Sequence, residues 1–267
     1  MKFIIHRFET CSSTNDVAKE MALRGAPEGT VVVADEQTAG RGTKGRSWHS
    51  PRGKGLYLSV VLRPASAKLS LLPLAAGLAV REAVERSHGL SAWLRWPNDV
   101  VWEGKKLGGI LCESGFLGNR PEYAILGVGL NVDHELDDFP EDLRGLAVSI
   151  RMACRRQADG GRGPGHCPGI HFRREGSSLD GAALLRRLLP EIGRWREIFE
   201  TSGGGAAIIE EFERNSIYRN GDPLAVAGEE GLVQGLYRGI DPDGALRLLV
   251  ANDIRRFSSA EIVRILQ

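Results

Sequence analysis

A glycine-rich, basic loop at residues 40–55 contains the residue types that most directly indicate chemistry: GRGTKGRSWHSPRGKG. It holds five glycines and five Lys or Arg residues, and no acidic residue occurs from Gln37 through Arg81. Glycine lets backbone N–H groups approach an anion, and arginine offers a forked donor to phosphate or carboxylate. With Trp48 as an aromatic face for a purine, the pattern predicts a mobile loop that closes over a nucleotide and an acid substrate. A solvated basic hairpin or an RNA-binding patch fits the composition equally well, and the G-x-x-x-x-G-K-[ST] phosphate motif is not present in the loop.

A second segment, LRWPNDVVWEGKKLGGILCES at residues 94–114, is predicted to be a strand–turn–strand unit with polar residues where the turn begins. Asn98 is a candidate to read an adenine edge or a phosphate, and Asp99 is a candidate metal or ribose ligand. Lys106, followed by glycines, can present its ammonium to a carboxylate inside a pocket. The alternatives are that Pro97-Asn98-Asp99 only forms a turn and that Lys106 is an ordinary surface lysine.

The third segment, ILGVGLNVDHEL at residues 125–136, alternates glycine with apolar residues. Gly127 and Gly129 fall on one face of the predicted strand, which therefore lacks side chains there and could receive a flat ligand or a closely packed helix. Asn131, at the end of the strand, is a candidate nucleotide contact.

These segments need elements to position them. A helix is predicted after Ser13 and Thr14, with Ser13 and Asp16 as a capping box and Gly25 as its end. Strands are predicted at residues 30–35 and 56–64, a helix at 70–88 closed by Gly89, and three further strands at AWLRW, KLGGILCES and EYAILGVGLNV. This order indicates an α+β layered domain rather than a strict β–α–β alternation.

The rest of the chain divides into three parts. Residues 151–178 are rich in Gly, Arg and Pro and are expected to be a flexible insertion. Within this segment, the spacing of Cys154, His166, Cys167 and His171 is not that of a standard zinc site. Helices follow at 180–200, where Pro190 is expected to kink or split the helix, and at AAIIEEFERNS. From residue 217, short strands with the hairpin signal DPDG predict a small β-barrel.

Composition excludes some classes of protein. The 267 residues carry a net charge of +1, which gives no general attraction to nucleic acid or membrane. No apolar run approaches the ~18–20 residues that span a bilayer. We also find no signal peptide and no CxxC pair among the four cysteines, so free thiols and a cytoplasmic location are expected.

In their order and spacing, GRGTKGRSW, WPND, KLGGIL and GVGLNV, preceded by CSSTND, resemble the biotin–protein ligases. The resemblance is good over residues 5–150 and loose over 180–267. It implies a mixed β-sheet layered with helices, of the class II aminoacyl-tRNA synthetase/biotin ligase-like kind, in a catalytic domain over residues 1–214. An SH3-like β-barrel over residues 215–267 is implied to follow. Because the catalytic segment begins near Met1, no DNA-binding module is expected before it and no DNA as a partner.

The resemblance also implies an activity and a site. Biotin and ATP would form biotinyl-5′-AMP with Mg²⁺, and biotin would pass to a lysine of a biotin carboxyl carrier protein; a homodimer is plausible. Lys106 and Arg41 are the implied catalytic residues. Biotin binding is implied for Ser13, Thr14, Asn15, Gln37, Gly40, Arg41, Lys106, Gly109 and Gly127. ATP binding is implied for Lys44, Arg46, Trp48, Asn98 and Asn131, with Asp99 near magnesium.

Two positions depart from the family pattern. Where another arginine is common after Gly42, this chain has Thr43 and then Lys44, so the adenylate is expected to be held less tightly unless Lys44 substitutes. Where a lysine commonly precedes Trp96, this chain has Arg95. The alternatives are a lipoate–protein ligase or octanoyl transferase, against which the Trp48-containing loop argues, and a nucleic-acid-binding regulator, which would leave Lys106 and Asp99 unexplained.

Overall fold

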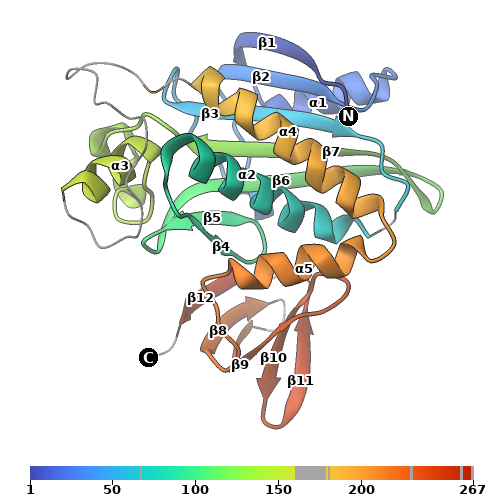
Figure 1. Cartoon of the computed structure of the whole chain (residues 1–267), viewed down its shortest axis with the longest axis vertical. Helices are drawn as coiled ribbons and strands as arrows, with labels where there is room; N and C mark the ends of the chain where they lie inside the picture. The colour runs from blue at the N-terminus through green and yellow to red at the C-terminus, as the bar shows by residue number, and fades with distance from the viewer. Residues whose placement is uncertain (67, 160–178, 180, 229–230, 259–260, 266–267) are drawn as a thin grey trace.

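The computed structural model describes residues 1–66, 68–159, 179, 181–228, 231–258 and 261–265, and its largest element is a seven-stranded mixed sheet (Figure 1). The strand order is β1-β2-β3-β7-β6-β5-β4. Only the β1–β2 pair of this sheet is parallel. The strands are β1 (Ile4–Cys11), β2 (Thr30–Gln37), β3 (Gly55–Leu62), β4 (Trp93–Arg95), β5 (Asp99–Trp102), β6 (Lys105–Leu117) and β7 (Arg120–Asn131).

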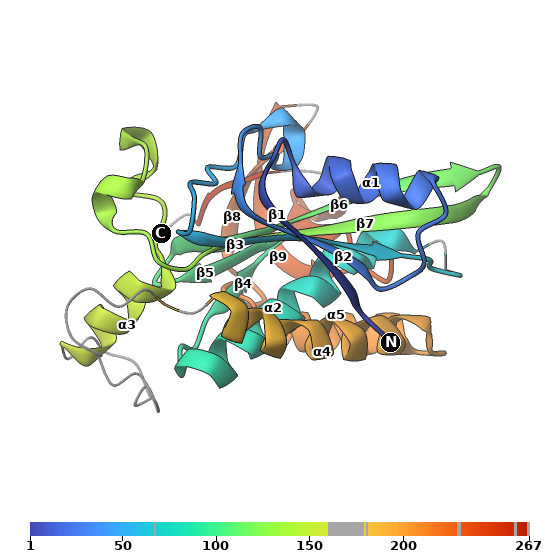
Figure 2. The ribbon, with the colours of Figure 1, turned by 90° about the horizontal axis from the view of Figure 1, so that it is seen from above.

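Helices cover both faces of this sheet, as predicted for a layered domain. Helix α1 (Thr14–Leu23) lies on one face, and α2 (Leu72–His88), α4 (Gly181–Glu200) and α5 (Gly204–Arg214) lie on the other (Figure 2). The side chains of β3 alternate between the two layers because successive residues of a strand point to opposite faces. Leu58 and Val60 enter the large core beneath α2, whereas Val61 packs with Ala18 and Ala22 of α1.

A second, smaller sheet follows α5 and is entirely antiparallel, in the order β11-β10-β9-β8-β12. Its strands are β8 (Pro223–Gly228), β9 (Gly231–Ile240), β10 (Leu246–Val250), β11 (Asp253–Phe257) and β12 (Glu261–Ile265). The DPDG segment forms the predicted turn between β9 and β10, with Gly244 at φ +83°. This turn reaches back to the first sheet, where the Trp96 indole N–H donates to the Gly244 carbonyl at 2.9 Å.

Several elements were not predicted as they occur, among them β1, β5, α3 and β12. Strand β1 escaped detection because its side chains are mostly exposed and show no alternation. The expected insertion begins later than residue 151, since α3 (Ile150–Ala158) is a regular helix whose first turn is capped by the Ser149 hydroxyl. Cys154 lies in the apolar core on this helix, so it is not available to a zinc site. The insertion's other candidate ligands, His166, Cys167 and His171, lie outside the described residues.

Two local predictions were wrong. The helix is not split at Pro190, since α4 continues through this exposed proline; the expected kink stays a prediction. Ser13 is the N-cap residue of α1 but its side chain makes no capping bond, and Asp16 pairs elsewhere. Short 3₁₀ turns occur at Thr43–Gly45, Leu69–Leu71, Leu136–Asp138 and Glu141–Leu143. Among the described residues, no helix combines the length and apolar composition needed to cross a bilayer.

Candidate functional site

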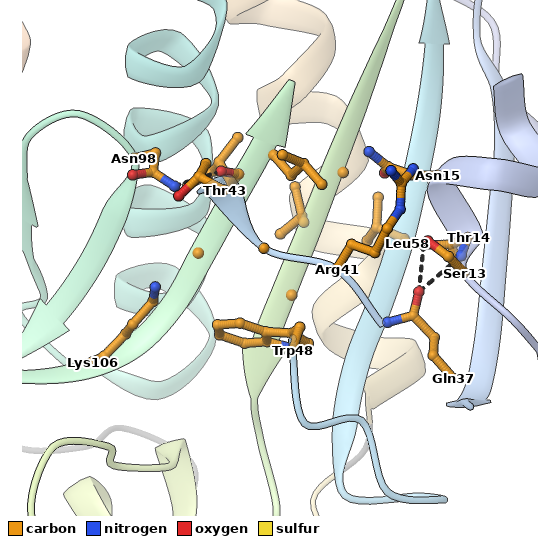
Figure 3. Close-up of a pocket in the computed structure, with 17 residues that line it drawn as sticks. Ser13, Thr14, Asn15, Gln37, Arg41, Thr43, Trp48, Leu58, Asn98 and Lys106 are labelled. Carbon is orange, nitrogen blue, oxygen red and sulfur yellow. Dashed lines mark hydrogen bonds between the residues drawn. The ribbon is translucent and has the colours of Figure 1, made fainter. Parts of the chain in front are cut away.

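A cavity of about 40 Å³ lies where the start of α1, the loop after β2 and the strands β6 and β7 meet (Figure 3). This volume accommodates a few water molecules at most. Ten of the residues implicated by sequence line it: Ser13, Thr14, Asn15, Gln37, Arg41, Trp48, Asn98, Lys106, Gly109 and Gly127. Segments that are far apart in the chain therefore meet at one place.

The floor of the cavity is a patch of sheet without side chains. Gly109 and Gly129 are cross-strand partners, and Gly127 is two residues further along β7 on the same face. Trp48 covers this patch so closely that a Cβ on Gly129 would lie 2.5 Å from the indole Nε1. That indole N–H is buried and has no hydrogen-bond partner in the described part of the chain. Gly129, which completes the patch, was recognised by its spacing but was not assigned to a ligand.

The start of α1 is fixed by side chains from β2 and β3. The Thr14 backbone N–H and hydroxyl donate to Gln37 Oε1 at 2.8 and 3.1 Å, while Gln37 Nε2 donates to Ser50 Oγ at 2.9 Å. The Ser59 hydroxyl lies 2.6 Å from Asn15 Oδ1. Since the first N–H groups of a helix have no partner within the helix, Gln37 satisfies one of them in place of the predicted cap.

Arg41 reaches the cavity wall from the basic loop and is held by two carboxylates. Its Nη2 lies 2.6 Å from Asp16 Oδ1 and 2.9 Å from Glu113 Oε2, and Glu113 also accepts a bond from Asn15 Nδ2 at 2.7 Å. Glu113 was not singled out from the sequence, although an acidic residue inside the otherwise apolar strand KLGGILCES was a signal.

Besides Arg41, two more of the five basic side chains of this loop are paired with acids that lie outside it. Arg52 pairs with Glu36 at 3.2 Å, and Lys54 pairs with Asp138 at 2.7 Å. Glu36 immediately precedes the acid-free stretch and Asp138 follows β7, so the loop has acidic neighbours although it contains no acid itself.

Lys106 forms the opposite wall. Its Nζ lies 2.7 Å from Asp99 Oδ1 and 5.3 Å from the centroid of the Trp48 ring, within reach of a cation–π contact. The other oxygen of Asp99 accepts from Arg95 Nη2 at 2.8 Å. Asp99 thus already neutralises two cations, and no group of three or more His, Cys, Asp or Glu suited to a metal occurs among the described residues. The expected magnesium contact of Asp99 stays a prediction.

The remaining predicted residues lie beside the cavity rather than in its lining. Gly40 allows close packing of the loop, because a Cβ there would lie 2.5 Å from the Trp48 carbonyl oxygen. Lys44 and Arg46 are exposed on the turn after Gly42, whereas Thr43 does line the cavity.

Asn98 and Asn131 both use their side-chain amides within the fold. Asn98 Nδ2 donates to the Ile110 carbonyl at 2.7 Å. Asn131 is buried, and its amide donates to the carbonyls of Lys106 and Val148 at 3.3 and 3.2 Å, which braces the strand that carries Lys106. Asn98 still lines the cavity, but Asn131 would need a change of partners to reach a nucleotide.

Comparisons with known proteins give a consistent picture. The profile of the biotin/lipoate A/B protein ligase family matches residues 8–131, and that of the biotin protein ligase C-terminal domain matches residues 225–264. The chain is 33% identical over 256 residues to the bifunctional ligase/repressor BirA of Bacillus spizizenii, covering 95% of this chain and 72% of that protein. It is 32% identical over 241 residues to the biotin–[acetyl-CoA-carboxylase] ligase of Paracoccus denitrificans, covering 88% and 90%.

A solved structure shows the same architecture. The biotin protein ligase from Aquifex aeolicus in complex with biotin and ATP superimposes with a TM-score of 0.77 at 27% identity, covering 97% of this chain and 98% of that one.

Proposed function

Since this chain belongs to the biotin/lipoate A/B protein ligase family, we propose that it is an ATP-dependent biotin–protein ligase. It forms biotinyl-5′-AMP and then transfers biotin to a lysine of a biotin carboxyl carrier protein of a carboxylase. The observation that carries this proposal is that Lys106 and Arg41 line one cavity whose floor is the glycine patch under Trp48.

The first step joins two anions. An oxygen of the biotin carboxylate attacks the α-phosphorus of ATP, a C–O–P link forms, and the bond to the β-phosphate breaks as pyrophosphate leaves. The ammonium of Lys106 offsets the repulsion between the reactants and stabilises charge that develops at the α-phosphate. Arg41 can do the same if an anionic substrate replaces one of its two carboxylate partners, which is feasible because its side chain is 40% exposed.

The second step transfers the acyl group. The neutral amine of the acceptor lysine attacks the acyl carbon, a C–N bond forms, the proton on nitrogen is released, and AMP leaves with the electron pair of the C–O bond. The anhydride must be kept from water between the steps, so the loop at residues 40–55 serves as the cover. Thr43 in the cavity wall, in place of an arginine, supports a weaker hold on the adenylate.

Magnesium enters this proposal only as part of the nucleotide substrate. The described residues do not form a metal site of their own, since Asp99 is paired with Lys106 and Arg95. We assign no step to a resident metal.

Three broader inferences accompany the activity. The change from the mixed sheet to the antiparallel sheet between α5 and β8 supports a catalytic domain over 1–214 and a C-terminal domain over 215–267. The dependence on ATP supports a cytoplasmic location. The exposed edge strand β1, with Ile4 and Ile5 in solvent, supports a homodimer that pairs along this edge.

Mass spectrometry tests the activity directly. Incubation with ATP, Mg²⁺ and biotin should yield biotinyl-5′-AMP, and addition of a carrier domain should convert its lysine to biotinyl-lysine. Exchange of labelled pyrophosphate into ATP, run separately with biotin and with lipoate, discriminates between the two acids that the family name covers. Exchange with lipoate alone, or salt-sensitive binding to single-stranded RNA without any exchange, would overturn the proposal.

A further inference from the structure

The basic loop over the cavity is held at both ends: Arg41 pairs with Asp16 and Glu113, and residues 49–54 contact the body of the protein. Its turn at Thr43–Gly45 is joined to the rest of the loop by local bonds, among them Gly42 N–H to the Arg46 carbonyl at 2.7 Å. Residues 49–54, by contrast, bond to the body of the protein: Gly53 N–H donates to the Asp35 carbonyl at 3.1 Å, and Tyr57 donates to the Pro51 carbonyl at 3.1 Å.

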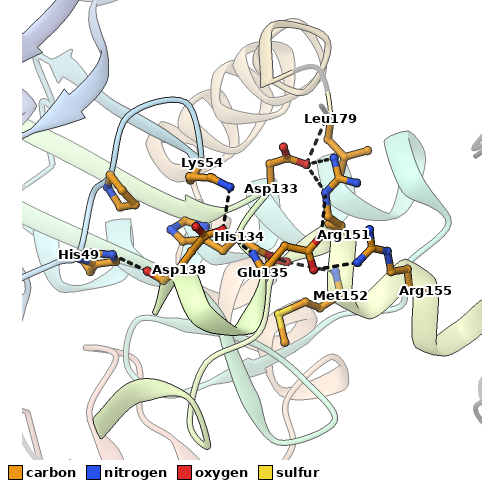
Figure 4. Close-up of polar contacts among 12 residues, drawn as sticks. His49, Lys54, Asp133, His134, Glu135, Asp138, Arg151, Met152, Arg155 and Leu179 are labelled. Atoms are coloured by element: carbon orange, nitrogen blue, oxygen red, sulfur yellow. Dashed lines mark hydrogen bonds and ion pairs between the residues drawn. The ribbon is translucent and has the colours of Figure 1, made fainter. Parts of the chain in front are cut away.

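Asp138 contacts both ends of the segment 49–54 (Figure 4). Its carboxylate lies 2.7 Å from Lys54 Nζ, and its backbone carbonyl lies 2.9 Å from His49 Nε2. The same carboxylate accepts the Glu135 N–H at 2.8 Å, which closes a turn around it. The Lys54 and Asp138 side chains are 34% and 29% exposed, so solvent screens this pair less than a surface ion pair.

The turn that carries Asp138 is itself anchored to α3. Arg151 pairs with Asp133, and Arg155 Nη1 lies 2.8 Å from Glu135 Oε2. The Lys54 carbonyl also accepts the Asp133 N–H at 2.7 Å. The turn that carries Asp138 is therefore held in place by α3. Trp48 directly precedes His49, the first residue of the segment 49–54 that Asp138 contacts.

We propose that Asp138 is a positioning residue: by holding Lys54 and His49 it fixes Trp48 over Gly109 and Gly129, and so sets the affinity of the site for its nucleotide. This inference rests on the proposed ligase function for its kinetic consequence. The positioning of Trp48 itself does not depend on that function, which allows the two to be tested separately.

The variant Asp138→Asn removes the charge and keeps the size of the side chain. We expect the KM for ATP in pyrophosphate exchange to rise about three- to tenfold with little change in kcat, as fits the loss of one partly buried ion pair. The matched control is Asp137→Asn, since Asp137 is the neighbour, 91% exposed, and pairs with Arg144 rather than with the loop.

A measurement without substrates tests the contacts of Asp138 with Lys54 and His49, called here the clamp, separately from the activity. Hydrogen exchange of a peptide covering residues 41–48 should be faster in Asp138→Asn than in the wild type and in Asp137→Asn. Acrylamide quenching attributed to Trp48, by difference against Trp48→Phe, should increase in parallel. If Asp138→Asn matches Asp137→Asn in KM, exchange and quenching, the positioning role is wrong. If the wild type exchanges no pyrophosphate while the hydrogen-exchange difference is seen, the ligase proposal fails and the clamp stands.

Discussion

Gly127 and Asn15 share a space that has room for only one side chain. A Cβ on Gly127 would lie 2.1 Å from Asn15 Oδ1, well inside van der Waals contact. With glycine there, the Asn15 amide lies against β7 and connects Ser59 at 2.6 Å to Glu113 at 2.7 Å. On this face of the strand, Asn15 therefore accounts for the glycine at 127 and Trp48 for the glycine at 129.

Gly127→Ala should displace Asn15 and break both of its hydrogen bonds. At about 1 kcal/mol for each bond, we expect biotin affinity to fall at least about tenfold. Isothermal titration calorimetry with biotin measures this, and Gly145→Ala is the control because a Cβ there meets no atom within 4 Å. Unchanged affinity in Gly127→Ala would show that Asn15 does not shape the biotin site.

Alanine at Gly129 and at Gly109 should affect Trp48 to different degrees. A Cβ at Gly129 would lie 2.5 Å from the indole, whereas one at Gly109 would lie 3.3 Å from it and displace it little. We expect the KM for ATP to rise several-fold more in Gly129→Ala than in Gly109→Ala. Equal effects, or the reverse order in pyrophosphate exchange, would contradict the placement of Trp48.

Lys106→Ala should slow formation of the adenylate by about 10²–10³, as is typical when one preorganised electrostatic contact to a transition state is lost. The melting temperature should change little, because the lysine side chain is 31% exposed. Lys105→Ala is the control: Lys105 is next in the chain but does not line the cavity. Rapid-quench measurement of biotinyl-5′-AMP would reject the catalytic assignment if both variants form it at the wild-type rate.

Stability should fall in mild acid because of His134. Burial lowers its pKa to about 4, and both ring nitrogens are without a hydrogen-bond partner among the described residues. The unfolded chain binds the proton near pH 6.5, so this contribution is complete above pH 6.5 and is lost as the pH falls toward 4. The loss is at most about 3 kcal/mol.

His134→Phe should keep the stack on Phe139 and remove this titration. Urea unfolding at pH 7.5 and at pH 4.5 measures the effect, and the variant should lose less stability than the wild type. A residual acid sensitivity is expected from His88, whose pKa is likewise lowered to about 4 by burial. The same loss in both proteins would exclude His134 as a source.

Local pattern was sufficient for most of the strands and for most of the polar residues that line the cavity. The glycines at 127 and 129, the lysine at the start of β6 and the polar end of α1 each had a signal in a short window, and their common order predicted that they meet. The partners of those residues were not accessible in this way: Asp16 and Glu113 reach Arg41 from 25 and 72 residues away. Such pairs depend on the order of the strands in the sheet, which a short window does not contain. Strand β1 was missed for a different reason, since its side chains are mostly exposed and do not alternate.

The hydrogen bond from Trp96 to Gly244 ties the C-terminal sheet to the segment of the first sheet that precedes Asn98. The first sheet also shares main-chain bonds with the linker. The Leu94 N–H donates to the Asn215 carbonyl at 2.9 Å, and the Leu94 carbonyl accepts the Ile217 N–H at 2.9 Å. These contacts hold the short segment immediately before Asn98 and Asp99, so the small sheet works as a buttress for one wall of the cavity. A chain cut after residue 214 would keep every residue that lines the cavity. It would lose the contacts to Leu94 and Trp96 that hold the segment carrying Asn98 and Asp99 in place.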